Sequence, residues 1–319
     1  MRAHARMTST GPAGIGRMAA VECSPFNTDW NRCILFRIIH RRDGGGCRGL
    51  QVRGRQVKES WGLWGEEDEA GAGNRIGAGE IARAASIVRH GKVFPLAQPI
   101  NRAMPVPRHR PGMAHFMTRD GGDYSPGRGS GFQFADDAVA LPIHAGTHID
   151  ALCHCWYGDT LYNGFEAVEV RSSGARRVGI DKVPPIVTRG VLLDFVAIAG
   201  RGLEDGFSIG AEMMIEAIDR SGCEIGAGDA ILMRTGWQER QSPDRLPDFD
   251  SEPGIDVEAA LLLARKGVCL IGADNFSIEV LPFARGTVFP VHQRLIRDFG
   301  ILLLEGLVLE PLASTGATQ

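Results

Sequence analysis

Strand-like and helix-like segments alternate along the second half of the chain, and this alternation limits the possible folds strongly. Apolar runs of strand length, such as 229–237 and 268–274, lie between segments whose apolar residues recur every three or four positions, such as 208–222 and 256–267. The pattern is continuous and shows no repeat of fixed period. It predicts an α/β fold, a single compact domain of mixed β-sheet with flanking helices.

The capping and turn residues refine these expected elements. Ser208 is the expected N-cap of one helix, and Gly267 is expected to end another. The segment 101–131 is rich in Gly, Pro and Arg, so we interpret it as a long loop. The sequence predicts helices at 79–91, 208–222, 256–267 and 291–300, and strands at 92–100, 132–143, 187–198, 229–237, 268–274 and 301–309.

The charge of the chain is distributed unevenly. Residues 1–58 carry 11 Lys and Arg against 3 Asp and Glu, whereas the remainder carries 24 against 35. An Arg-rich, acid-poor leader is typical of an organelle transit peptide. The segment also lacks sustained periodicity, and we favour a disordered basic extension without a catalytic role. The expected boundaries are therefore 1–58 for the extension and 59–319 for the folded domain.

The whole chain has the composition of a globular protein of the cytoplasm. Its net charge of -3 and isoelectric point near 6.3 argue against nucleic acid or a membrane as the main partner. The apolar runs stop short of the roughly 20 residues that span a bilayer. The seven cysteines are irregularly spaced, which suits a reducing compartment and hence a cytoplasmic location.

Residues 144–154, HAGTHIDALCH, contain three of the nine histidines and one aspartate. A straight strand would hold His144 and His148 about 13 Å apart, and a helix would turn Asp150 away from them. Gly146 tolerates backbone angles that let the chain curl between the histidines. We expect the segment to curl, at the end of a strand, around something small and positive.

Imidazole and carboxylate groups are ligands for zinc, manganese and related divalent ions, so this segment predicts a metal site. The simpler alternative is a polar turn with ordinary histidine hydrogen bonds. A zinc finger that uses Cys153 and Cys155 is disfavoured, because their spacing lacks the usual gap and no second Cys pair follows.

A second candidate feature lies near the C-terminus, where Glu305 interrupts the apolar run ILLLEGLVL. A lone buried carboxylate costs several kcal/mol unless it is paired, protonated or bound to a metal. His292 lies thirteen residues earlier, in the short helix expected before this strand. Either Glu305 pairs with an arginine such as Arg294, or Glu305 and His292 form the second half of a metal site.

These residues carry a resemblance to a known family. HAGTHIDALCH resembles the H-x-G-T-H-x-D-x-P-x-H signature of the bacterial kynurenine formamidase-like, or cyclase, family of metal-dependent hydrolases. FPVHQRLIRDFGILLLEGLVL is similar to the family's C-terminal His…Glu segment, and WGEEDEAGAGN and AASIVRHGKVFPLAQPI look like the opening of its longer members. The resemblance covers residues 60–312. Leu152 stands where better-known members have proline, which bears on subgroup and substrate.

The resemblance implies roles for the candidate residues. His144, His148 and Asp150 would hold one divalent ion, and Asp150 would bridge to a second ion. His154 would be the general acid/base. Three protein ligands leave positions open for water, as a catalytic site requires. One or two ions of Zn²⁺ or Mn²⁺ are expected, because both metals fit N and O ligands. The ligands implied for the second ion are Asp150, His292 and Glu305.

The implied activity is metal-dependent hydrolysis of an amide, formamide or cyclic amide bond, as in arylformamidases. Two alternatives remain open. A lyase, dehydratase or cyclase would use the same ions to stabilise an enolate, and a non-catalytic metal-binding protein is disfavoured because His154 and Glu305 are both present. The expected partners are a small-molecule substrate, either aromatic or a cyclic amide, and other copies of the chain in a homodimer or homotetramer.

Three further segments have expected roles. The loop 101–131 and the pair Trp156–Tyr157 are candidate walls of a substrate pocket, since aromatic side chains suit a flat substrate. GADNFSIEVLP also resembles a family segment, and we interpret its carboxylates, Asp274 and Glu279, as structural.

Overall fold

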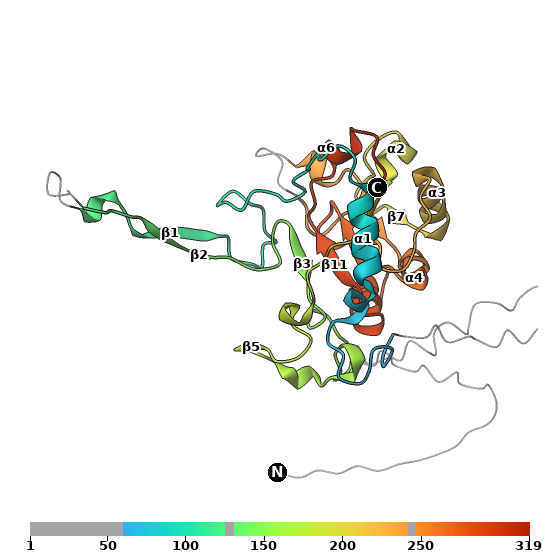
Figure 1. Cartoon of the computed structure of the whole chain (residues 1–319), viewed down its shortest axis with the longest axis horizontal. Helices are drawn as coiled ribbons and strands as arrows, with labels where there is room; N and C mark the ends of the chain where they lie inside the picture. Colours follow the sequence, from blue (N-terminus) through green and yellow to red (C-terminus); the bar gives the residue numbers. More distant parts are fainter. Residues whose placement is uncertain (1–59, 125–130, 242–246) are drawn as a thin grey trace, which may run out of the picture. The chain divides into compact units, whose positions relative to one another are not determined.

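The structure is a computed structural model that describes residues 60–124, 131–241 and 247–319 (Figure 1). The basic segment 1–58 lies outside the described residues, so its expected role stays a prediction. Within the described ranges, no helix is both long and apolar enough to cross a membrane.

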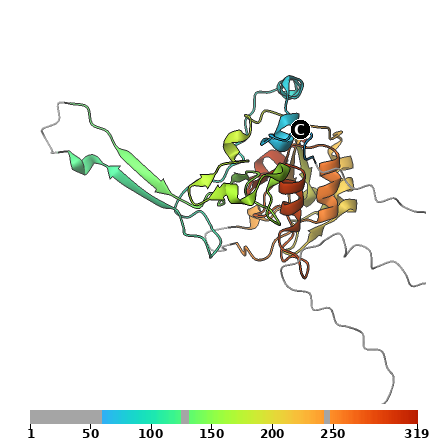
Figure 2. The same cartoon turned by 90° about the horizontal axis from the view of Figure 1, so that it is seen from below.

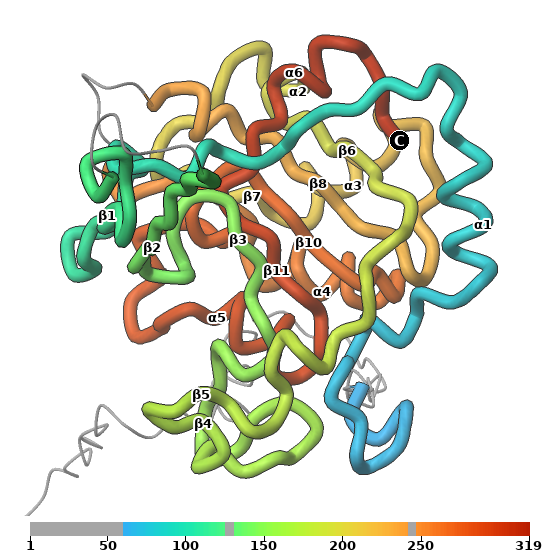
Figure 3. Tube along the Cα trace, turned by 60° about the vertical axis from the view of Figure 1, so that its left-hand side comes forward, coloured from blue at the N-terminus to red at the C-terminus, as the bar shows by residue number. Residues whose placement is uncertain are grey.

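A five-stranded sheet forms the centre of the fold, in the order β3-β11-β10-β8-β6 (Figure 3). β6, β8, β10 and β11 run parallel, and β3 pairs antiparallel with β11. The parallel strands are short apolar runs, as expected for a sheet that is buried on both faces. The predicted mixed α/β fold is confirmed. The strands are β3 (His148–Asp150), β6 (Gly190–Asp194), β8 (Ala230–Arg234), β10 (Leu270–Ala273) and β11 (Leu302–Glu305).

Helices cover one face of the sheet and build the main core there. Met214 and Leu263 of two neighbouring helices are buried in the same cluster as Ile231 of the sheet. Burying a side chain of this size contributes about 1.5–3 kcal/mol relative to leaving it exposed. The elements on this face are α3 (Ala211–Ser221), α4 (Val257–Arg265) and the π-helix η8 (Gln293–Asp298).

A smaller apolar cluster covers the opposite face. It contains Leu192, Leu307 and Leu309, together with residues of a short C-terminal helix. Leu192 lies between Val191 and Leu193, which both belong to the main core, as the two-residue period of a strand requires. The C-terminal helix is α6 (Glu310–Ala313).

The expected helix ends are partly confirmed. The Asp256 side chain accepts a hydrogen bond from the Ala259 N–H at 2.8 Å and so caps α4, and Gly267 follows it with a positive φ of 78°. The prediction of Ser208 as the N-cap of α3 is wrong, because the cap is Gly210. Ser208 instead begins the short strand β7 (Ser208–Ile209). This strand pairs with another short strand, β9 (Gly254–Ile255).

The prediction of a strand at 92–100 is wrong. Pro95 and Pro99 lack the N–H groups that a sheet ladder needs, and the segment forms no strand, although the carbonyl of Leu96 accepts a hydrogen bond from the N–H of Val308 at 2.8 Å. The helix predicted at 79–91 is present as α1 (Ala78–Ile87). Arg83 of α1 forms an ion pair at 2.7 Å with the buried Asp229, which fixes the helix to the domain.

The loop expected at 101–131 contains a strand. β1 (Ala114–Arg119) pairs antiparallel with β2 (Asp136–Ala140), which lies inside the strand predicted at 132–143. The hairpin extends away from the central sheet, as Figures 1 and 2 show. The Gly, Pro and Arg residues around β1 obscured its short extended pattern in the sequence.

The strand predicted at 187–198 is shorter than expected, because it ends at Asp194 and a helix follows. The Asp194 side chain accepts a hydrogen bond from the Ala197 N–H at 3.0 Å and caps that helix. The remaining elements are α2 (Phe195–Ala199), α5 (Pro290–His292), β4 (Val170–Arg171), β5 (Gly174–Ala175) and the 3-10 turns Gly71–Arg75, Gly121–Asp123, Tyr162–Gly164, Ala167–Glu169, Ile180–Lys182 and Gln238–Arg240.

Candidate metal centre

The antiparallel pairing of β3 with β11 brings the two candidate halves of the site together. Glu305, the last residue of β11, lies directly opposite His148, the first residue of β3. The two-residue period of β3 then places Asp150 on the same face as His148. The cluster thus forms at the carboxyl end of β11, the edge where parallel α/β sheets bind their ligands.

The Gly-Thr pair of HAGTHID produces the predicted curl. Gly146 has a φ of 60°, and a Cβ atom on it would lie 2.5 Å from the sulfur of Met104. The ring centroids of His144 and His148 are consequently only 5.0 Å apart. The Thr147 hydroxyl donates to the carbonyl of Gly306 at 2.6 Å, which fixes the curl beside the end of β11.

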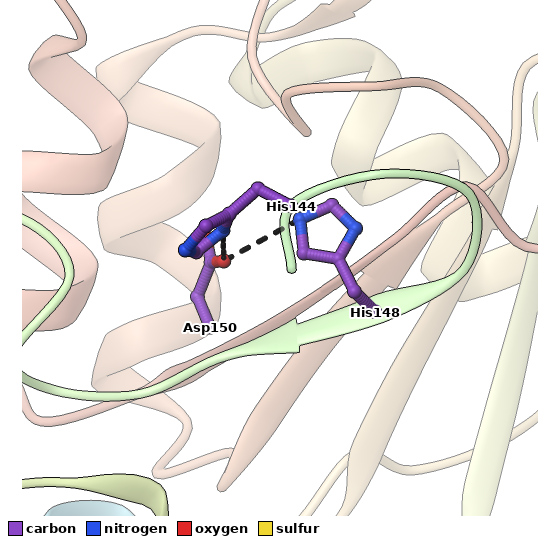
Figure 4. A group of neighbouring side chains, drawn as sticks. All are labelled: His144, His148 and Asp150. Atoms are coloured by element: carbon purple, nitrogen blue, oxygen red, sulfur yellow. Dashed lines mark ion pairs between the residues drawn. The ribbon is translucent and has the colours of Figure 1, made fainter. Parts of the chain in front are cut away.

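The first group of side chains is drawn in Figure 4. Asp150 is fully buried, and its Oδ1 lies 2.7 Å from Nδ1 of His144 and 3.6 Å from Nε2 of His148. Nδ1 of His148 lies 3.1 Å from the carbonyl oxygen of Gly146. In the neutral ring we assign the proton to this Nδ1, so that Nε2 faces the cluster as a possible ligand.

The second group uses the other oxygen of the same carboxylate. Nε2 of His292 lies 3.7 Å from Oδ2 of Asp150 and 3.2 Å from Oε1 of Glu305. Oε2 of Glu305 lies 3.2 Å from Nε2 of His148. Glu305 is therefore buried between two histidines, whereas Arg294, its alternative partner, forms an ion pair with Asp298. The structure therefore brings Glu305 and His292 together, and their binding of a metal ion stays a prediction.

His154 lies at the edge of the cluster. Its Nε2 is 3.8 Å from Oδ2 of Asp150, and its ring stacks on that of His144 with 3.8 Å between centroids. The side chain keeps 30% of its surface exposed, unlike the buried His148 and His292. A ring nitrogen of His154 lies close to the possible ligand atoms of Asp150 and His292, so the geometry allows His154 to bind an ion as well as to carry a proton.

The polar atoms of the cluster fit a divalent cation. Among the described residues, several buried atoms lack a hydrogen-bond partner although they lie close together, because they are not aligned for hydrogen bonds. Each such atom costs about 1–3 kcal/mol when it stays unsatisfied. Imidazole nitrogens and carboxylate oxygens together suit zinc and manganese. The atoms are Nδ1 of His144, Nε2 of His148, Oδ1 and Oδ2 of Asp150, and Oε1 of Glu305.

The charges of the cluster follow from burial and from the mutual proximity of the groups. Burial raises the pKa of Asp150, but the histidines around it outweigh burial and lower this pKa to about 2. Burial lowers the pKa of His154 to about 4. Burial also lowers the pKa of His148, but Glu305 and Asp150 outweigh it and raise this pKa above its ordinary value. Asp150 is therefore ionised and His154 neutral at pH 7.

A cavity of about 820 Å³ lies beside the cluster. The ring of Phe289, which lines the cavity, lies 5.0 Å from the ring of His292. The predicted wall in the loop 101–131 is present at residues 105–109. The other predicted wall, the pair Trp156–Tyr157, does not line this cavity, and the Tyr157 hydroxyl instead donates a hydrogen bond to Oδ1 of Asp298 at 2.8 Å. Four aromatic side chains line the cavity: Phe249, Phe276, Phe283 and Phe289.

These four phenylalanines were not identified from the sequence, and neither was the position of Glu279. All four phenylalanines lie outside the helices and strands. The periodic pattern of a buried helix or strand therefore does not explain an aromatic residue at these positions, and this was the one signal in the sequence. Asp274 accepts hydrogen bonds from Thr235 and Gly236, in keeping with a structural role. Glu279 instead lies 2.6 Å from Nδ1 of His292.

The fold and the cluster define the class first: an α/β protein with a buried group of histidines and carboxylates that fits a divalent metal. Residues 94–280, more than half of the chain, match the model of the Cyclase family, described as "Putative cyclase". A crystal structure described as a novel cyclase is 34% identical, with a TM-score of 0.74, over 81% of this chain and 89% of that chain. The protein belongs to the cyclase family, which confirms the resemblance.

Two solved structures of lower identity share the fold. Isatin hydrolase A from Labrenzia aggregata, bound to benzyl benzoate, is 20% identical with a TM-score of 0.50, over 67% of this chain and 79% of that chain. Isatin hydrolase A from Ralstonia solanacearum is 20% identical with a TM-score of 0.51, over 71% and 83%. No protein of curated function matches the chain.

Replacing Glu305 tests its assignment as a ligand. We expect Glu305→Gln to lower the number of bound ions while preserving volume and shape, because an amide is a far weaker ligand than a carboxylate. The measurement is metal content per chain by elemental analysis, with the thermal unfolding temperature as a check on folding. Full metal content with a lower unfolding temperature would show that Glu305 only pairs with charged neighbours.

Metal affinity should fall as the pH falls through neutrality. Despite burial, Glu279 and Glu305 raise the pKa of His292 well above its ordinary value, as Glu305 and Asp150 do for His148. An incoming cation must displace these protons, so its uptake should release protons, and the affinity should rise with pH until both histidines are neutral. Calorimetric titration of Zn²⁺ between about pH 6 and about pH 8 measures this dependence. An affinity independent of pH would contradict it.

Proposed function

We propose that this protein hydrolyses the carbon–nitrogen bond of an amide, formamide or cyclic amide, with one or two Zn²⁺ or Mn²⁺ ions as cofactor. The observation that supports this most is the group of converging nitrogen and oxygen atoms without hydrogen-bond partners beside an aromatic cavity. Two proteins of the same fold are named as hydrolases, which agrees with the proposal.

The ligands divide between two positions that share Asp150. His144, His148 and Asp150 would hold one ion, and Asp150, His292 and Glu305 the other. A divalent ion held there supplies polarisation of the substrate carbonyl and a water molecule of lowered pKa. Asp150 suits a bridging role, because its two oxygens face different histidines and its pKa of about 2 keeps it ionised.

His154 is the proton carrier in this proposal. Its lowered pKa leaves it neutral at pH 7, so its ring can accept a proton from the attacking water. Stacking on His144 holds the ring beside the cluster, and its partial exposure leaves it open to the substrate. Having accepted the proton, His154 can pass it to the departing nitrogen, which an amide needs in order to leave as an amine.

The cavity binds the ring of the substrate in this proposal. Phe249 and Phe276 meet edge to face at 4.8 Å, and Phe283 and Phe289 do so at 4.6 Å, so two aromatic pairs line the space beside His292. Aromatic walls favour flat apolar groups and fix their orientation. An aryl amide, or a cyclic amide fused to a ring, would place its carbonyl at the cluster and its ring in this cavity.

A panel of substrates tests the reaction class. The metal-loaded protein is incubated with N-formyl aryl amines, cyclic imides and hydroxy acids, and the products are identified by mass spectrometry. We expect products that have gained one water at a C–N bond. Loss of water from the hydroxy acids, without hydrolysis of any amide, would indicate a lyase or dehydratase and contradict the proposal.

Paired substitutions separate the ligand role from the proton-carrier role. His148→Ala should lose metal and activity together, because it removes one of three ligands to an ion. His154→Ala should keep its metal and lose about 10²- to 10⁴-fold in turnover, which is the usual contribution of a general acid/base. Its pH–rate profile should also lose the acid limb, which reflects protonation of His154 as the pH falls towards its pKa of about 4. If His154→Ala lost its metal as well, His154 would be a ligand.

A further inference from the structure

Glu279 is a buried carboxylate that contacts His292, a candidate ligand. Its Oε1 accepts a hydrogen bond from the backbone N–H of His292 at 3.0 Å and lies 2.6 Å from Nδ1 of the same residue. Its Oε2 accepts from the backbone N–H of Val291 at 3.1 Å. One carboxylate therefore fixes both the backbone and the ring of His292.

The backbone around Glu279 is held rigidly. Gly254 packs so closely against it that a Cβ atom on Gly254 would lie 2.3 Å from the carbonyl carbon of Glu279. Ile278 has a φ of 63°, a conformation that a β-branched residue keeps only when its surroundings force it. The carboxylate of Glu279 thus reaches His292 from a fixed base.

This contact decides which nitrogen of His292 is available to an ion. A carboxylate only accepts hydrogen bonds, so the 2.6 Å contact assigns the proton of the neutral ring to Nδ1. Nε2 is then free of its proton and faces Asp150 and Glu305. A carboxylate behind a ligating histidine fixes its tautomer and orientation and increases its basicity.

We propose that Glu279 is a positioning residue for the second ion, acting through His292. This inference rests on the proposed two-ion centre. Capping the start of α5 would be a purely structural alternative, since Glu279 also accepts the N–H groups of Val291 and His292. Under that alternative, replacing Glu279 would change stability, whereas under our proposal it would selectively weaken the ion that His292 binds.

Glu252 provides a matched control. It is fully buried and accepts the backbone N–H groups of Phe276 at 2.9 Å and of Ser277 at 2.8 Å, together with the hydroxyl of Ser277. It therefore makes the same kind of contacts as Glu279, two backbone N–H groups and one side chain, but the side chain is a serine. Glu252→Gln removes a buried carboxyl group with comparable hydrogen bonds without touching His292.

The experiment is a titration of the metal-free proteins with Co²⁺, followed by visible absorption and by elemental analysis. We expect the wild type and Glu252→Gln to bind two ions with similar affinities. Glu279→Gln should bind the first ion normally and the second about 10- to 100-fold more weakly, with a changed spectrum for that ion. Glu279→Asp keeps the charge but moves it away by one methylene, so its affinity for the second ion should lie between those of the wild type and Glu279→Gln. It replaces Glu279→Gln in the experiment if that variant does not fold.

Any of three results would overturn this inference without affecting the two-ion centre. Glu279→Gln binds both ions as the wild type does, Glu252→Gln weakens binding of the second ion to the same extent, or Glu279→Gln loses affinity for the first ion. A wild type that binds fewer than two ions would instead overturn the proposed two-ion centre, and this inference with it. The two failures are distinguished by the wild-type titration.

Discussion

The carboxylate of Asp150 is the constraint on which the rest of the site depends. It is completely buried, its pKa of about 2 keeps it ionised, and imidazole nitrogens approach its two oxygens at 2.7 to 3.8 Å. A buried charge is tolerated only when it is paired or coordinates a metal. The four histidines that surround it are His144, His148, His154 and His292.

The fold meets this constraint by joining segments that are far apart in the chain. The antiparallel pairing of β3 with β11 sets Glu305 opposite His148, and the contact of Gly146 with Met104 bends the preceding loop so that His144 turns back. His292 arrives from the short helix before η8, and π-helical turns of this kind are frequent at functional sites. Four candidate ligands thus lie at the ends of helices or strands, namely His148, Asp150, His292 and Glu305, whereas His144 lies in the bend before β3.

The sequence predicted the cluster because its signals are local. Four candidate side chains fall in eleven residues around Gly146, and Glu305 is conspicuous as a carboxylate in an apolar run. The α/β fold was likewise readable, because the parallel strands are short apolar runs separated by amphipathic helices. The metal ligation itself and the role of His154 remain predictions.

What the sequence did not reveal depends on tertiary contacts. Glu279 meets His292 only because its segment packs against Gly254, and the four phenylalanines line one cavity although they lie on separate turns. The prediction of a strand at 92–100 was wrong because its prolines cannot donate the hydrogen bonds of a sheet. The strand β1 was not predicted because the Gly, Pro and Arg residues around it are typical of a loop. Such features follow from partners that are distant in the chain.

The central claim is that Asp150 bridges two divalent ions. Anomalous diffraction from crystals of the protein, recorded on both sides of the zinc and manganese absorption edges, tests it most directly. The account predicts two peaks, each about 2.0–2.2 Å from an oxygen of Asp150, one beside His148 and one beside His292. Crystals grown with these ions that show fewer than two anomalous peaks within bonding distance of Asp150 would contradict it.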